Sequence, residues 1–311
     1  MQYRKDAMTN RFVKLDSWVR ELIVDPLSKE PLTPDNGSNW LVSSYGRKYP
    51  VSGDLLDLRL LNNQTTDDQK IWEQGQREYE KWNAALSSQD NNRSYLSDIE
   101  SLREVYDQIP VQGRCLDVGG HQGRLRKFLA PGQEYLSCDP SLKCFDDLED
   151  QPNLLKAYPF LLDPVNFVCC DAEFLPFRSL SFQTVHMRSV IDHLLSPELA
   201  LNEAYRVLEA DGALIVGLYV HGGKRGRSGM VSCIKEYIKA SMKKERINRF
   251  KDYHIWHPAY KELTDLIEDC GFTVEKTYWQ KGHNDSVCYI LARKHAGLIS
   301  KRSAGCRMIN E

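Results

Sequence analysis

The sequence lacks any long apolar run. Nowhere do 18 apolar residues follow one another, and the start of the chain, residues 1–6, has no apolar stretch behind it. A helix that crosses a bilayer needs about 20 apolar residues, and a secretory signal needs an apolar stretch after a charged start. We therefore expect a cytoplasmic protein with no membrane partner.

Paired cysteines are also missing. Nine cysteines occur among 311 residues, an odd number, and none has the Cys-x-x-Cys spacing. Most of them fall inside predicted strands, as small buried residues do. This distribution argues against a disulfide framework and against a cysteine zinc site, so we expect no bound metal.

The chain as a whole has little excess charge of either sign. The 41 basic and 43 acidic residues leave a net charge of −2, and 41% of the residues are hydrophobic. Such a composition excludes a disordered chain and indicates a globular protein. The length suits one catalytic domain with an accessory segment.

The most informative segment is residues 112–123, which read Gln-Gly-Arg-Cys-Leu-Asp-Val-Gly-Gly-His-Gln-Gly. A short apolar strand is followed by an acidic residue and by a glycine-rich turn that opens a predicted helix. Glycines allow close approach of a ligand, and a helix N-terminus presents free N–H groups, so the loop is expected to hold a cofactor. A dinucleotide fold requires Gly-x-Gly-x-x-Gly, and His121 replaces its second glycine, which weakens the nicotinamide interpretation.

Three predicted strands end on carboxylates. Asp117, Asp139 and Asp171 each follow an apolar segment. In an open α/β sheet, ligands bind at the carboxyl ends of the parallel strands, so the three groups are expected to converge on one site.

This order of motifs resembles the class I S-adenosylmethionine-dependent methyltransferases. The resemblance covers residues 93–293 and continues through residues 171–177, 181–185, 189–194 and 203–216. It implies S-adenosyl-L-methionine as the cofactor. Two departures stand out: His121 replaces the usual middle glycine of the loop, and Gln183 replaces an aspartate that is common in the fourth strand.

The resemblance also implies roles for single residues. The loop from Asp117 to Gly123 would surround the methionine part, Asp139 would bind the ribose, and Asp171 with Ala172 would hold the adenine. The full set of expected cofactor-binding residues is Asp117, Gly119, Gly120, His121, Gly123, Asp139, Asp171, Ala172 and Arg188.

The expected fold is α/β, a Rossmann-like, doubly wound and mainly parallel seven-stranded sheet. Helices are predicted at 122–130, 197–208 and 258–270, and strands at 181–188 and 212–220. The last two strands, near 272–279 and 285–293, are too close for a helical crossover and are expected to form an antiparallel hairpin. A small β-rich segment precedes this domain.

We expect four parts along the chain: a β-rich N-terminal domain (1–62), a helical cap (63–110), the methyltransferase domain (111–295) with an insert at 221–257, and a flexible tail (296–311). The first part resembles the zinc-ribbon-like domain that precedes or activates some methyltransferases. There, paired cysteines occupy the positions of Asp25 and Ser28, so a metal-free version is expected. In the cap, Trp72, Tyr79 and Trp82 either fold over the cofactor or pack on the sheet.

The insert is basic. Residues 221–252 contain ten Lys and Arg against Glu236, Glu245 and Asp252, a net charge of +7. This charge can attract an anionic acceptor, or it can be the solvated face of an amphipathic helix.

Candidate bases lie after the fourth and fifth predicted strands. Methyl transfer needs a general base only where the acceptor carries a proton of high pKa. His193 and His257 are the expected catalytic residues, with His254 and Tyr219 as further pocket candidates. A His-x-x-His metal site formed by His254 and His257 is disfavoured, because no third ligand is evident in the sequence.

The preferred function is methylation of a small-molecule or glycan-precursor acceptor, on oxygen, because one insert and a helical cap suit a modest enclosed pocket. An RNA methyltransferase is one alternative, although the sequence has no Asn-Pro-Pro-Tyr-like motif. A catalytically silent methyltransferase-like scaffold is the other, suggested by His121 and by the missing ribbon cysteines.

Overall fold

A computed structural model describes residues 10–35, 37–60, 74–75, 77, 93–146, 148–225 and 254–294. The α-helices are α1 (Ser17–Leu22), α3 (Arg93–Gln108), α4 (Pro152–Ala157), α5 (Pro197–Val207) and α7 (Tyr260–Asp269). Short 3₁₀ helices are η1 (Arg124–Phe128), η2 (Leu148–Asp150), η3 (Pro159–Leu162), η4 (Ala172–Phe174), η5 (Ile191–His193) and η6 (Gly223–Arg225). Within these ranges no helix is long and apolar enough to cross a membrane.

The strands are β1 (Thr33–Pro34), β2 (Trp40–Val42), β3 (Lys48–Ser52), β4 (Leu55–Asp57), β5 (Cys115–Val118), β6 (Tyr135–Asp139), β7 (Phe167–Cys169), β8 (Phe182–Arg188), β9 (Leu208–Tyr219), β10 (Phe272–Trp279) and β11 (Val287–Lys294). They form one sheet with the order β1-β2-β3-β4-β7-β6-β5-β8-β9-β11-β10. The pairs from β4 to β9 are parallel, whereas β11 is antiparallel to both β9 and β10. The predicted α/β class, the mainly parallel sheet and the C-terminal antiparallel hairpin are confirmed.

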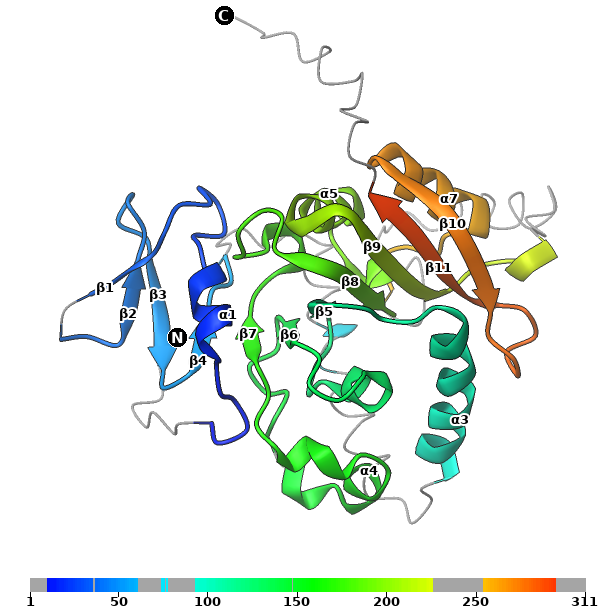
Figure 1. Ribbon diagram of the computed structural model, residues 1–311, viewed down its shortest axis with the longest axis horizontal. Helices are drawn as coiled ribbons and strands as arrows, with labels where there is room; N and C mark the ends of the chain where they lie inside the picture. The colour runs from blue at the N-terminus through cyan, green and yellow to red at the C-terminus, as the bar shows by residue number, and fades with distance from the viewer. Residues whose placement is uncertain are drawn as a thin grey trace, which may run out of the picture.

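Helices cover both faces of the central strands, and Figure 1 shows α5 and α7 on one side and α3 and α4 on the other. Successive residues of β5 alternate between the two layers, as the pleat requires. Leu116 and Val118 pack with α1, α5 and α7, whereas Cys115 packs with α3 and α4. Because both faces of the central strands are buried, the sequences of these strands are nearly continuous apolar runs.

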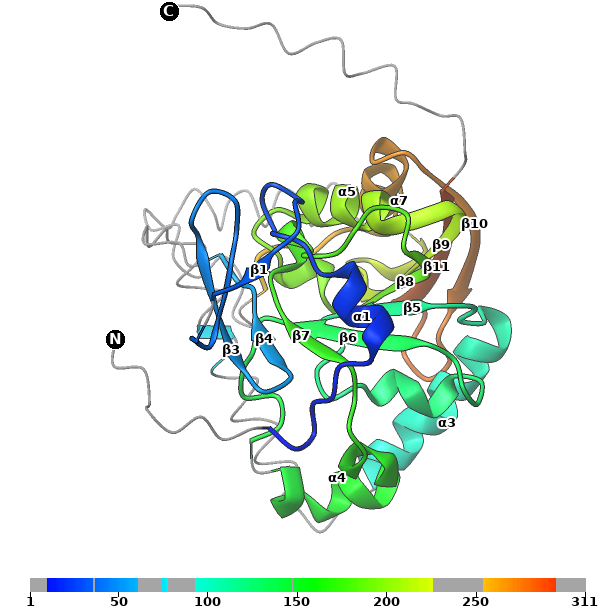
Figure 2. The ribbon, with the colours of Figure 1, turned by 60° about the vertical axis from the view of Figure 1, so that its left-hand side comes forward.

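The four N-terminal strands extend this sheet. β4 lies parallel to β7, with Leu56 opposite Val168 and Asp57 opposite Cys169. Figure 2 shows the N-terminal strands, in blue, beside β7. The edge of the parallel sheet is thereby covered, which removes an exposed edge strand.

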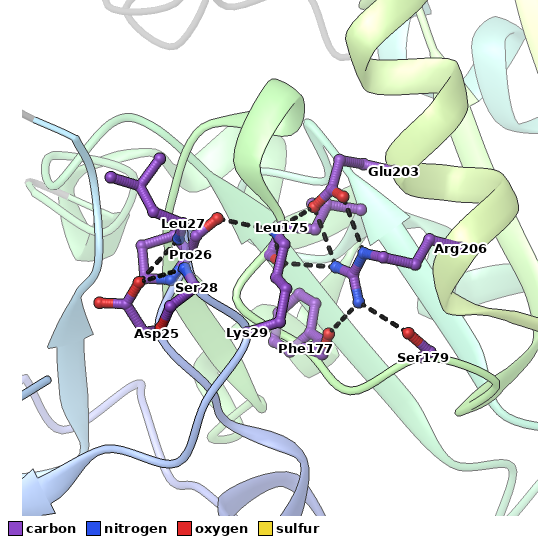
Figure 3. A network of polar contacts seen from close by, with 10 residues as sticks. All are labelled: Asp25, Pro26, Leu27, Ser28, Lys29, Leu175, Phe177, Ser179, Glu203 and Arg206. Atoms are coloured by element: carbon purple, nitrogen blue, oxygen red, sulfur yellow. Dashed lines mark hydrogen bonds and ion pairs between the residues drawn. The ribbon is translucent and has the colours of Figure 1, made fainter. Parts of the chain in front are cut away.

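A turn at residues 25–29 connects these strands to α5 and to the loop that follows η4 (Figure 3). The Asp25 carboxylate accepts the backbone N–H groups of Leu27 and Ser28 at 2.8 and 2.7 Å and the Tyr49 hydroxyl at 2.8 Å. Although burial opposes ionisation of Asp25, these hydrogen bonds lower its pKa overall. A hydrogen-bonded carboxylate therefore organises the turn, and Asp25 is the residue that the sequence resemblance set in place of a zinc-binding cysteine.

Lys29 joins the turn to α5. Its Nζ lies 2.6 Å from Glu203 Oε2 and also donates to the carbonyl oxygens of Pro26 and Leu175. Glu203 in turn binds Arg206 at 2.7 Å. Lys29 has a φ of 61°, the left-handed region that glycine usually occupies.

Two elements differ from the sequence-based prediction. The helix expected at 122–130 is only the short 3₁₀ helix η1, and Leu129 is already extended. Ala130 precedes Pro131, and a proline disfavours the helical backbone conformation for the residue before it. β9 begins at Leu208 rather than at 212, because Leu208 pairs with Phe182 and an irregularity in register follows.

Candidate cofactor and acceptor site

A cavity of about 1560 Å³ lies at the carboxyl ends of β5, β6, β7 and β8. This is the position at which α/β sheets bind ligands. Sites for single small ligands usually measure about 300–1,000 Å³, so the volume has room for a cofactor together with an acceptor. All nine expected cofactor-binding residues except Gly123 line it.

The glycine loop is closely packed against its surroundings. Gly119 has a φ of 69°, and a Cβ atom there would lie 2.3 Å from Val190 Cγ2. At Gly120 a Cβ atom would lie 2.6 Å from Asp117 Cγ and from Ser137 Oγ. Only glycine fits either position without movement of its neighbours.

His121 adopts a left-handed backbone conformation, which glycine adopts more readily than other residues. Its φ is 50°, which is uncommon for a residue with a side chain and costs on the order of 1 kcal/mol. Its carbonyl oxygen accepts the Ser137 hydroxyl at 2.9 Å. The loop therefore accommodates a residue with a side chain at this position.

Asp139 ends β6 and is buried, with 8% exposure. It accepts the backbone N–H of Ser141 at 2.9 Å. Desolvation raises the pKa of Asp139, while the nearby His121 and the backbone N–H groups of Ser141 and His121 oppose the rise. The structure thus places the expected ribose-binding carboxylate directly beside the substituted loop residue.

Asp171 follows β7 and is the next carboxylate at the cavity. The backbone N–H of Leu60 donates to its Oδ2 at 2.9 Å. Burial raises the pKa of Asp171 to about 6, and the nearby Glu173 adds to the rise. Ala172, buried at 7% exposure, begins η4 next to it.

Asp117 is placed differently from the other two carboxylates. The Tyr135 hydroxyl donates to its Oδ2 at 2.6 Å, and His186 Nδ1 lies 2.7 Å from its Oδ1. His186 Nε2 is in turn 2.9 Å from the Tyr106 hydroxyl of α3. Both carboxylate oxygens of Asp117 are therefore engaged by protein groups in a buried network.

Sequence reasoning missed this network. The register of the sheet sets Asp117 opposite His186 on one neighbouring strand and opposite Ser137 on the other. A histidine inside the otherwise apolar segment 182–188 was the available signal, because buried polar side chains require a partner.

Arg188 ends β8 and lines the cavity beside α3. Its guanidinium donates to Asp98 Oδ1 at 2.9 Å. The pair joins β8 to α3, the helix that precedes β5, and no pattern in the sequence singles out Asp98.

Three histidines gather near the end of β8. The rings of His193 and His254 have centroids 4.3 Å apart, and those of His254 and His257 are 5.1 Å apart. Asp192 lies behind them, with Oδ2 at 3.3 Å from His254 Nε2. Of the three histidines, His193 lines the cavity, whereas His257 and Tyr219 are not among the described lining residues.

Three sequence-based hypotheses fall on residues outside the described ranges, and the expected tail at 296–311 is one of them. Trp72, Tyr79 and Trp82 of the expected cap lie there, as does the basic insert from residue 226 to residue 253. Helix α3 of the cap is described, and its Tyr95, Asp98 and Leu102 line the cavity.

The chain matches a known family and several known proteins. Residues 116–216 match the methyltransferase domain family model. An uncharacterised protein of Methanocaldococcus jannaschii is 25% identical over 195 residues, which cover 63% of this chain and 77% of that protein. The ubiquinone/menaquinone biosynthesis C-methyltransferase of Cereibacter sphaeroides is 33% identical over 106 residues, 33% of this chain and 41% of the relative.

A solved structure with a similar chain path is the 1,6-didemethyltoxoflavin-N1-methyltransferase of Burkholderia thailandensis, which holds S-adenosylhomocysteine. It is 13% identical, with a TM-score of 0.48, and the match covers 78% of this chain and 96% of that chain. The family match spans β5 to β9, the strands that carry the glycine loop and the strand-end carboxylates. Residues 116–216 are therefore a methyltransferase domain of the S-adenosylmethionine-dependent type.

Proposed function

We propose that the protein methylates a hydroxyl oxygen of a small-molecule or glycan-precursor acceptor. The observation that carries this proposal is the single large cavity, which joins a carboxylate-rich end to a histidine-bearing end among the described residues. Its volume of about 1560 Å³ suits two small ligands side by side.

The carboxylate-rich end fits the cofactor. The close-packed loop at Gly119 and Gly120 would hold the methionine part, Asp139 the ribose hydroxyls, and Asp171 with Ala172 the adenine. Asp117 would position this loop through Tyr135 and His186, since both of its carboxylate oxygens are already engaged. When bound, S-adenosylmethionine supplies a methyl group on a sulfonium sulfur.

The other end suits an acceptor with an apolar part and a hydroxyl group. Leu195 and Leu199 are 49% and 46% exposed and line the cavity there. His193 lies beside them and is the residue best placed to take a proton from the acceptor hydroxyl. His257 would act only through His254 and His193, because neither His257 nor His254 is among the described lining residues.

Three further expectations stay predictions. An anionic acceptor depends on the basic segment 221–252, most of which lies outside the described residues. The division of the chain at residues 62, 110 and 295 and the cytoplasmic location also rest on the sequence.

The test is methyl transfer from S-adenosylmethionine labelled in the methyl group. The full chain would be given hydroxylated small molecules, sugar phosphates, nucleotide-linked sugars and transfer RNA. We expect label on an oxygen of a small molecule, with His193→Gln lowering kcat by roughly 10²-fold or more while cofactor affinity is kept. Label only in RNA, or only on nitrogen or carbon, would overturn the proposal.

A further inference from the structure

Asp192, His193 and His254 form a compact cluster of donor atoms. Asp192 and His193 belong to η5, directly after β8, and His254 lies before α7. His254 Nε2 is 3.3 Å from Asp192 Oδ2, and His193 Nε2 is 4.0 Å from Asp192 Oδ1. One donor atom from each residue lies within 4.8 Å of the other two.

Asp192 supplies a second, independent observation. Its side chain is only 9% exposed, and within the described part of the chain its Oδ1 has no hydrogen-bond partner. A buried carboxylate oxygen that lacks a partner is unfavourable unless a cation or a donor compensates it. The carboxylate thus presents an unused acceptor toward His193.

The backbone holds the two halves of the cluster together. The carbonyl oxygen of Asp192 accepts the N–H groups of Ile255 and Trp256 at 2.9 and 3.2 Å. These bonds fix the segment that carries His254 against η5, although the two are about sixty residues apart in sequence. The donor atoms are therefore brought together by the fold.

We propose that Asp192, His193 and His254 bind one divalent transition-metal ion of the zinc type. Two imidazole nitrogens with one carboxylate oxygen suit Zn²⁺ and similar ions, whereas Mg²⁺ and Ca²⁺ prefer oxygen ligands alone. Ligand atoms at about 2.0–2.2 Å from a tetrahedral ion lie about 3.3 Å apart. The His254–Asp192 separation of 3.3 Å has this value. The three donor atoms lie within 4.8 Å of one another, so His193 reaches this spacing by an approach of about 1.5 Å or less.

The cluster faces the acceptor end of the cavity through His193. Three protein ligands leave an open position on the ion, and an acceptor hydroxyl bound there would have its pKa lowered. In the ion-bound protein His193 is a ligand, so the ion would take over the activation that His193 gives in the absence of the ion. This use of the ion rests on the proposed function, whereas binding of the ion does not.

The experiment is a titration of the full chain with Co²⁺, followed by visible absorption, after treatment with a chelator and its removal. Zn²⁺ is then added to displace Co²⁺. We expect one ion per chain, with affinity at least tenfold weaker in Asp192→Asn and in His254→Ala. The exposed His283 lies outside the cluster, so His283→Ala is the matched control and should bind as the wild type does.

Binding of S-adenosylmethionine by each variant shows that the variant is folded and separates the ion site from the cofactor site. The proposal is supported if the ion is lost while the cofactor is still bound. It is overturned if the folded wild type takes up no ion, if both substitutions leave the affinity unchanged, or if His283→Ala weakens it equally.

Discussion

Gly119 is the residue on which the cofactor loop depends most closely. Gly119→Ala places a side chain at a φ of 69° and a Cβ atom 2.3 Å from Val190 Cγ2. We expect a loss of about 2–4 kcal/mol in the free energy of unfolding, measured in urea, because left-handed strain adds to overpacking. Affinity for S-adenosylmethionine should fall as well.

Gly132 offers a matched control. It has a similar φ of 77°, but a Cβ atom there would meet nothing within 4 Å. Gly132→Ala should therefore show the backbone strain alone, about 1 kcal/mol, with cofactor binding intact. Equal effects of the two substitutions would mean that the contact with Val190 is unimportant.

We expect the proposed adenine contact of Asp171 to make cofactor binding depend on pH. Burial raises the pKa of its carboxyl to about 6, so the group is ionised at pH 8 and mostly protonated at pH 5. Only the ionised form accepts a hydrogen bond from the adenine amine fully, so affinity should be complete above about pH 7, decline through pH 6 and fall by about tenfold towards pH 5.

Calorimetric titration between pH 5 and 8 measures this dependence. Asp139 also has a raised pKa, so the variant Asp171→Asn is needed to separate the two groups. The difference between the wild-type and variant profiles gives the contribution of Asp171 to the pH dependence of cofactor affinity. Profiles of the same shape would show that Asp171 does not bind the cofactor through its charge.

Asp139 and Asp171 could be located from the sequence, because each follows an apolar run and strand ends converge in a parallel sheet. The partners of Asp117 could not. His186 lies 69 positions along the chain from Asp117, and only the register of β5 with β8 brings them together. The same holds for Asp192 and His254, whose proximity depends on the fold after the insert.

Among the elements, the N-terminal turn contacts α5 and the loop after η4 through the half-buried Lys29. Lys29→Met removes the ion pair with Glu203 and donors to two carbonyl oxygens while keeping most of the apolar chain. We expect a loss of about 1–3 kcal/mol in the free energy of unfolding, because these contacts are partly shielded from water.

Lys48 provides the comparison for that measurement. It forms an ion pair with Asp35 at 2.9 Å on the surface, with its side chain 55% exposed. Lys48→Met should change the free energy of unfolding by no more than about 0.5 kcal/mol. If both lysines behave alike, the Lys29 contacts do not fasten the turn.

Strand positions were predicted better than strand pairing. The predicted bounds of β8, β10 and β11 lie within two residues of the observed bounds. Burial on one or both faces of a strand determines its composition, so such strands can be located from their apolar residues. The parallel pairing of β4 with β7 was not predictable. β4 has three residues, and its partner lies more than a hundred residues further along the chain.

In the molecule as a whole, the carboxylate end of the site follows from the order of the central strands. The order β7-β6-β5-β8-β9 places three strand-end carboxylates and the end of β8 around one cavity. Its carboxylate end was predictable because it depends on the parallel strands alone. The acceptor end also depends on α3, η5 and the segment before α7, whose packing no local pattern in the sequence specifies.

The most direct test of this account is calorimetric binding of S-adenosylmethionine and S-adenosylhomocysteine to the wild type and to Asp139→Ala. Loss of the ribose hydrogen bonds should reduce the binding free energy by about 1.5–3 kcal/mol, roughly 10- to 150-fold in affinity. Asp265→Ala, at an exposed position on α7, should bind as the wild type does. The account predicts micromolar binding by the wild type that Asp139→Ala alone weakens. A folded wild type that binds neither ligand, or an Asp139→Ala variant of unchanged affinity, would contradict it.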